Sequence, residues 1–270
     1  MGFGSCEVWA FDCEWAPDVS AGRRLYGLDS GVDDAEVLRV MWEMGGATPE
    51  DPRPFLKTIL CRICSIAAVV RYKSPPGNPQ IAIAAIGAPD DPSGGAPDEK
   101  LILKRFLEDG YSVRRPVLVG YNSRNADLHI LAQRAFVNGL SLPRFSDCIR
   151  AKPWNSPDID LMDTLGGFGK SYGASLNEVA RLCGIPGKLD VCGDDVAELF
   201  YTGQYEKIVR YNTFDALTTY LVWLRLEFFQ GSISKTEYDA EQAALRTFVE
   251  RRISAQGETW LQAFLDEWRF

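Results

Sequence analysis

No apolar run in the 270-residue sequence approaches the ~18 residues that span a bilayer, so we expect no membrane-spanning helix. The N-terminus lacks a basic segment followed by an apolar core, so we expect no signal peptide. The seven cysteines are odd in number and scattered. Cys61 and Cys64 have C-x-x-C spacing, but they lie in an apolar, strand-like run without a second ligand pair, which favours buried free thiols over a zinc or redox site. These features together predict a cytoplasmic protein.

The sequence also lacks the excess of positive charge that usually supplies affinity for phosphate, since its formal net charge is -8. One explanation is that the substrate is not nucleic acid. The other is that bound divalent cations neutralise a cluster of carboxylates, while a few Lys and Arg side chains contact phosphate locally. The net charge alone does not decide between the two.

The hydrophobic fraction of 46% and the charged fraction of 24% are ordinary for a globular protein, and the length suffices for one substantial core. We expect a single domain over residues 1–270, with its core at about 6–230 and a helical C-terminal extension at about 232–270. The helices from Ser234 onward are expected either to cap this domain or to support self-association into a homo-oligomer.

The first apolar segment, residues 8–15, reads as a short strand that ends in an acidic pair. Side chains two residues apart point to the same face of a strand, so Asp12 and Glu14 share a face. Two like charges this close repel each other unless a metal ion lies between them. The alternative is a solvated strand end, because Asp-x-Glu often occurs by chance.

The remaining apolar patterns predict an α/β domain with a mixed sheet flanked by helices. Residues 59–70 and 81–86, joined by a turn rich in Pro, predict an antiparallel hairpin. A long connection, residues 16–56, follows the first strand and is as consistent with a flap over a site as with an idle loop. Further elements are expected as a strand at 116–121 and helices at 34–44, 98–109, 125–138, 175–183, 194–201, 205–229, from 234 onward and at 259–268, with a turn at 185–188.

Two later acidic positions are candidates to complete a site with Asp12 and Glu14. Asp127 follows the strand at 116–121 and begins a helix, where its simplest role is to stabilise the helix N-terminus. Tyr211 and Asp215 are four residues apart on a long helix and therefore share a face. An acid on such an apolar helix is costly unless it is paired, exposed or bound to metal, and an exposed Asp is the simpler alternative.

The combination of these positions is far more specific than any one of them. Asp-x-Glu on a first strand, a later Asp at a strand-to-helix junction and Tyr-x-x-x-Asp on a late helix resemble the three motifs of the DEDD superfamily, which comprises 3'-5' exonucleases of RNase H-like (DnaQ-like) fold. The tyrosine marks the DEDDy branch, whose sister branch has histidine there. His129, the single histidine, does not occupy that position in motif order, and we interpret it as structural or as a neighbour of the ligands.

Further segments narrow the resemblance to stand-alone predicted 3'-5' exonucleases related to the proofreading domain of family-B DNA polymerases. Two departures from that family's pattern concern substrate contacts more than metal binding. Residues 122–127 read Asn-Ser-Arg-Asn-Ala-Asp where the family often has Asn-Gly-x-x-Phe-Asp, and residues 157–159 lack a common histidine. The segments that carry the resemblance, which spans about residues 7–240, are 11–18, 23–25, 160–163, 184–188, 211–221 and Arg225.

The resemblance implies a two-metal-ion 3'-5' exonuclease that hydrolyses single-stranded DNA or RNA from a free 3' end to nucleoside 5'-monophosphates. Oxygen ligands suit two Mg²⁺ or Mn²⁺ ions rather than zinc. Tyr211 would orient the attacking water. Arg23 and Arg24 are weaker candidates for phosphate contacts. The implied metal ligands are Asp12, Glu14, Asp127 and Asp215, and the implied substrate contacts are Asn122, Arg124 and Trp15.

Two other functions are consistent with the same residues. A catalytically silent nucleic-acid-binding or scaffold protein with an exonuclease fold would be favoured by the loss of any one ligand, and none is missing. Another RNase H-like metal enzyme, such as an endonuclease, is disfavoured by the Tyr-x-x-x-Asp helix.

Overall fold

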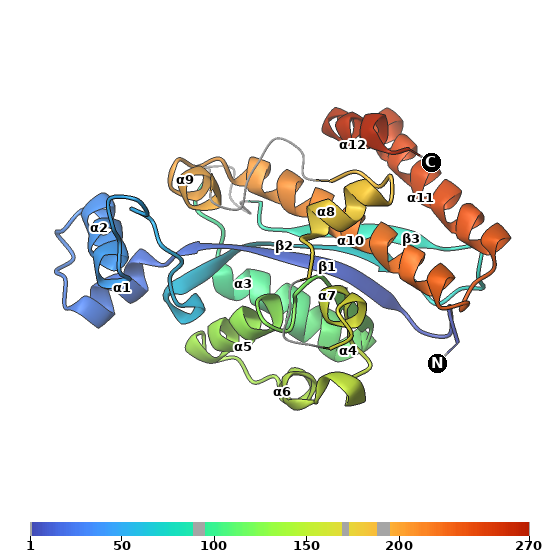
Figure 1. The fold of residues 1–270 in the computed structure, drawn as a ribbon. Coiled ribbons are helices and arrows are strands. Elements are labelled where there is room, and N and C mark those ends of the chain that lie inside the picture. The colour runs from blue at the N-terminus through green and yellow to red at the C-terminus, as the bar shows by residue number, and fades with distance from the viewer. Residues whose placement is uncertain (1, 89–94, 169–172, 188–194, 270) are drawn as a thin grey trace.

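The computed structural model describes residues 2–88, 95–168, 173–187 and 195–269, and a five-stranded sheet of order β3-β2-β1-β4-β5 lies at their centre (Figure 1). β1 pairs antiparallel with β2 and parallel with β4, so the predicted mixed sheet is confirmed. The predicted hairpin is also confirmed, because β2 and β3 pair antiparallel. The strands are β1 (Val8–Pro17), β2 (Cys61–Arg71), β3 (Ile81–Ile86), β4 (Val117–Gly120) and β5 (Ile159–Asp160).

Helices cover both faces of the sheet (Figure 1). α10 (Tyr205–Phe229) packs on one face against β1 and β2, and α11 (Lys235–Gln256) packs on α10. α3 (Glu99–Leu103) and α5 (Asp127–Val137) pack on the opposite face. The other helices are α1 (Val19–Tyr26), α2 (Asp34–Met44), α4 (Ser112–Arg114), α6 (Pro143–Arg150), α7 (Leu161–Leu165), α8 (Leu176–Leu182), α9 (Val196–Tyr201) and α12 (Gln262–Glu267), with short 3₁₀ turns at Thr58–Leu60, Pro153–Asn155 and Thr259–Leu261.

The alternation of side chains along β1 divides its residues between two separate cores. Val8 and Ala10 belong to the core beneath α10, whereas Trp9 and Phe11 belong to the core beneath α3 and α5. By the same period of two, the next residues on the α10 side are polar, beginning with Asp12. The acidic pair of β1 is therefore aimed at the one helix that carries Asp215.

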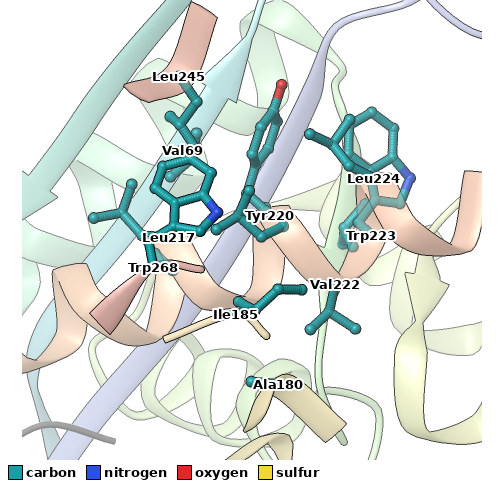
Figure 2. Packing of buried hydrophobic residues seen from close by; sticks show 14 of the residues in the cluster. Val69, Ala180, Ile185, Leu217, Tyr220, Val222, Trp223, Leu224, Leu245 and Trp268 are labelled. Atoms are coloured by element: carbon teal, nitrogen blue, oxygen red, sulfur yellow. The ribbon is translucent and has the colours of Figure 1, made fainter. Parts of the chain in front are cut away.

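The core beneath α10 joins the sheet to the C-terminal helices. Figure 2 shows Leu217, Tyr220 and Leu224 of α10 packed with Val69 of β2 and Leu245 of α11. These side chains are almost fully buried, and burying one such apolar side chain contributes about 2 kcal/mol. This packing fixes α10 across the strand that carries Asp12 and Glu14.

Several predicted helices begin or end differently in the structure. The helix expected at 98–109 is α3, followed by a π-helical segment at Lys104–Tyr111 and then by α4. Gly110 lies against the Trp9 ring, where an added Cβ would come within 2.7 Å of the indole, and this close contact accompanies the wider turn. β5 was not predicted, because two residues are too few to show a pattern. Asp194, at the start of one expected helix, and Lys188, in an expected turn, lie outside the described residues.

Residues 16–56, which we call the insert, contain the end of β1 followed by α1 and α2. The two helices pack closely, because an added Cβ at Gly22 would lie only 2.5 Å from the Met41 sulfur. A buried ion-pair network holds the start of the insert to the opposite face of the sheet. Arg134 of α5 reaches Asp18 and Glu99, each with a nitrogen–oxygen distance of 2.7 Å.

α11 is held to the sheet by a second buried ion pair. Arg71 of β2 and Glu241 of α11 are both inaccessible to solvent, and their charged atoms are 2.7 Å apart. This packing places α11 against the domain, and both roles expected for the C-terminal helices stay predictions. Cys61 and Cys64 are buried free thiols, as predicted. Within the described residues, no helix combines the length and the apolar character needed to cross a bilayer.

Candidate metal centre and substrate cleft

Three carboxylates from distant parts of the sequence converge at the centre of the α10 face. Asp12 and Glu14 of β1 and Asp215 of α10 each offer an oxygen, and these three atoms lie within 4.8 Å of one another. The group is withdrawn from water, since Glu14 is 9% and Asp215 is 7% exposed. Burial raises the pKa of Asp12 well above its usual value, and the charges of Asp127, Glu14 and Asp215 raise it further. A divalent cation would remove this repulsion.

Asp127, at the start of α5, contacts β1 beside the same centre. Its Oδ1 accepts a hydrogen bond from the backbone N–H of Cys13 over 3.1 Å, between the two acidic residues of the strand. The residue is 5% exposed, and burial raises its pKa to about 7 although backbone N–H donors oppose this. Asp127 is not one of the three carboxylates that cluster within 4.8 Å, but it lines the same cleft.

Tyr211 lies one helical turn before Asp215 on the same face of α10, as the spacing predicted. Its side chain is buried, and its pKa is raised first by burial and then by the charges of Asp215, Glu14 and Asp12. The phenol is therefore neutral at any ordinary pH. It can donate or accept a hydrogen bond beside the carboxylates, but it is a poor proton acceptor.

Asn212 is a functional residue to which the sequence assigned no role. Its Nδ2 donates to Oδ2 of Asp12 over 2.7 Å, and its Oδ1 accepts from the Ser65 hydroxyl over 3.0 Å. Asn212 is fully buried. The only signal in the sequence is a polar residue within a strongly apolar helix, which does not reveal a partner on β1. This bridge fixes the orientation of the Asp12 carboxylate.

Asp160 shapes the loop that precedes Asp127. Its carboxylate accepts backbone hydrogen bonds from Asn122 over 3.0 Å and from Arg124 over 2.9 Å, and it also caps α7. Asn122 has a left-handed backbone with φ of 58°, a conformation that asparagine tolerates better than most residues. Asp160 thus holds the backbone of the loop that leads into α5. The Asp-x-x-Asp spacing in the sequence does not predict this role.

The expected substrate contacts are not all in the same place. Trp15 and Asn122 line the cleft beside the carboxylates. Arg124 instead directs its guanidinium to the backbone oxygen of Asp158 over 3.2 Å and does not line the cleft. Arg23 pairs with Asp34 within the insert. Arg24 lines a separate cavity near Arg134, and His129 is exposed on α5.

The cleft has a volume of about 860 Å³ and is bounded on one side by the carboxylates and Tyr211. Trp42 and residues 51–56 of the insert also line this cleft, and we call this set of residues the cleft wall. The insert is therefore part of the site rather than a remote loop. Buried carboxylate oxygens that repel one another fit a hard dication such as Mg²⁺ or Mn²⁺, which takes oxygen ligands.

The chain matches, over residues 53–268, the family described as "Predicted 3'-5' exonuclease related to the exonuclease domain of PolB", and it belongs to that family. The matched region contains Asp127, Tyr211 and Asp215 but begins after β1. The structure is what brings Asp12 and Glu14 to them. No curated protein sequence matches the chain.

Among solved structures, the chain is similar to the family B DNA polymerase from the hyperthermophilic archaeon Pyrobaculum calidifontis, with a TM-score of 0.51 and 16% identity. The similarity covers 83% of this chain and 24% of the polymerase, so the chain spans about a quarter of that protein's length. At this level of identity the similarity concerns the fold, and it agrees with the RNase H-like mixed sheet expected from the sequence.

Proposed function

We propose that the protein is a metal-dependent 3'-5' exonuclease that hydrolyses single-stranded nucleic acid from its 3' end to nucleoside 5'-monophosphates. The observation that carries this proposal is the convergence of Asp12, Glu14 and Asp215 within 4.8 Å, in a chain of a 3'-5' exonuclease family. Asp127 lines the same cleft and supplies the fourth acidic group.

The residues present fit a pair of divalent ions. Asp12, Glu14 and Asp215 would hold them, with Asp127 completing the set from α5. When bound, such ions neutralise charge on the phosphate and lower the pKa of a coordinated water. The protein's contribution is to bring the carboxylates together and to orient them, and Asn212 orients Asp12 through its hydrogen bond.

Tyr211 acts as an orienting residue rather than as a base. Its buried phenol remains protonated, so it would hold the attacking water by a hydrogen bond and not by removing its proton. The geometry that supports this role is its position one turn from Asp215 on the surface of the cleft. A silent scaffold is a weaker alternative, because all four acidic positions are intact.

The test is incubation with 5'-labelled single-stranded DNA and RNA in Mg²⁺ or Mn²⁺. We expect a ladder that shortens from the 3' end, and Asp12→Ala and Asp215→Ala should abolish it. Asp239→Ala is a matched control, since Asp239 lies on α11 outside the cleft and pairs with Lys235 at the surface. Absence of digestion, or digestion that survives both substitutions at the site, would overturn the proposal.

A further inference from the structure

The charges that line the cleft are unevenly distributed. Among the described residues that line it, six are acidic and one, Arg53, is basic. A phosphodiester strand entering such a cleft is repelled everywhere except where cations stand. Two divalent ions would attract the phosphate at the carboxylates. Arg53, on the cleft wall, is the one basic side chain among the described lining residues, and it could attract a phosphate away from them.

Arg53 is held in place but remains available to a ligand. It lies between Pro52 and Pro54, which restrict the backbone, and its guanidinium stacks on the Trp42 ring at 5.3 Å. Within the described residues it forms one ion pair, with Glu198 of α9 at 3.6 Å, and both side chains of that pair are exposed. An exposed pair of this kind contributes little to stability, so a phosphate can replace it at low cost.

Phe55 is an apolar side chain left in solvent at the same wall. It is 80% exposed, while the neighbouring Leu56 is 6% exposed and packs against Gly45. The anchored Leu56 therefore presents the Phe55 ring to the cleft instead of letting it collapse into the core. Aromatic faces in nucleic-acid clefts stack on bases without regard to sequence.

We propose that the cleft wall is the binding site for the single strand adjacent to the cleaved nucleotide. Arg53 binds a backbone phosphate, and Phe55 stacks on a base. This inference rests on the proposed exonuclease activity and adds to it the residues that select a single strand. A base next to the terminal pair of a duplex is stacked on both of its faces, so it could contact Phe55 only after the duplex had been unstacked.

The test compares Arg53→Ala and Phe55→Ala with two matched controls that lie outside the cleft. Arg39→Ala removes an exposed arginine of α2, and Phe136→Ala removes an 82% exposed phenylalanine of α5. Steady-state cleavage of labelled oligothymidylate and oligouridylate should show KM raised roughly tenfold by each wall substitution. The value of kcat should stay close to that of the unmodified protein, and both controls should leave KM unchanged.

Two further readouts distinguish direct contact from a structural role. Arg53→Ala should lower the slope of log KM against log salt by about 0.7, as expected for one lost phosphate contact on a single strand. Arg53→Lys should restore part of the affinity, and Phe55→Trp should restore most of it. Equal KM values for wall and control variants, or a loss confined to kcat, would overturn the inference.

A binding assay separates failure of this inference from failure of the proposed activity. Fluorescence anisotropy of the same oligonucleotides in Ca²⁺ measures affinity without requiring cleavage. If the protein does not digest the oligonucleotides but both wall substitutions weaken binding, the proposed binding site is supported and the proposed exonuclease activity is contradicted. If digestion proceeds and neither wall substitution weakens binding, the proposed exonuclease activity is supported and the proposed binding site is contradicted.

Discussion

Asn212 and Asp12, which are 200 positions apart in the sequence, are joined by a hydrogen bond of 2.7 Å from Nδ2 to Oδ2. The bond crosses from α10 to β1 and continues to Ser65 of β2. It lowers the pKa of Asp12 against the combined effect of burial and three neighbouring charges. Asn212 therefore favours the ionised, correctly turned carboxylate that a metal requires.

Asn212→Ala should weaken binding of Mg²⁺ or Mn²⁺ by about tenfold to a hundredfold, because groups that orient metal ligands typically have effects of this size. Isothermal titration calorimetry with Mn²⁺ would measure the loss directly. Ser65→Ala, which removes only the outer partner of Asn212, should have a smaller effect in the same direction. Unchanged Mn²⁺ affinity in Asn212→Ala would show that Asp12 needs no orienting partner.

Tyr211→Phe should slow cleavage by roughly a hundredfold while leaving Mn²⁺ affinity nearly intact, because it removes one preorganised hydrogen bond and no ligand. Since the phenol stays protonated, the shape of the pH–rate profile should not change. Single-turnover cleavage from pH 6 to pH 9 would measure both properties. Loss of a basic limb in the phenylalanine variant would instead identify Tyr211 as a titrating group.

The stability of the metal-free protein should fall as the pH rises toward and through 7. Asp127 has its pKa raised to about 7 in the folded state, above the unfolded value near 3.9, so folding favours its protonated form. That contribution is present at low pH and is lost as the pH rises through the folded pKa. The raised pKa of Asp12 acts in the same direction.

Asp127→Asn removes this dependence and should raise the metal-free Tm at pH 8 by roughly 5 °C. Mg²⁺ should raise the Tm of the unmodified protein more at pH 8 than at pH 6, because protons compete with the ion. Differential scanning fluorimetry with EDTA or Mg²⁺ across this range checks both statements. An unmodified protein whose metal-free Tm does not fall between pH 6 and pH 8 would contradict the assignment.

Glu241→Ala should destabilise the protein by about 3–5 kcal/mol, because it leaves the fully buried Arg71 without its partner. The double variant Arg71→Met with Glu241→Leu should be closer to the unmodified protein. Lys235→Ala, which breaks an exposed pair on the same helix, should cost less than about 1 kcal/mol. Urea unfolding of the set gives the values, and a double variant as unstable as Glu241→Ala would refute the argument.

The sequence predicts those features of the fold and the site that depend on the spacing of residues within one strand or one helix. The period of two along β1 placed Asp12 and Glu14 on one face, and the apolar pattern of α10 gave its bounds at 205 and 229. The spacing of Tyr211 and Asp215 placed them together. Each of these follows from geometry within a single element.

The remaining features depend on contacts between elements that the chain brings together only on folding. The partner of Asn212 lies on a strand near the other end of the sequence. The π-helical turn at Lys104–Tyr111 accompanies the contact of Gly110 with Trp9, which no local pattern records. The same holds for Arg53 and Phe55, because only the folded structure shows that the insert lines the same cleft as Asp215.

Arg134 has a consequence for protein engineering. It neutralises Glu99 on α3 and Asp18 at the root of the insert, and it belongs to the same helix that begins with Asp127. An exchange of the insert for a segment of different substrate preference must therefore keep an acid at position 18. An exchanged segment without this acid would remove one of the two carboxylates that pair with the buried Arg134. Because Arg134 and Asp127 belong to the same helix, we expect such an exchange to lower activity even where it changes substrate preference.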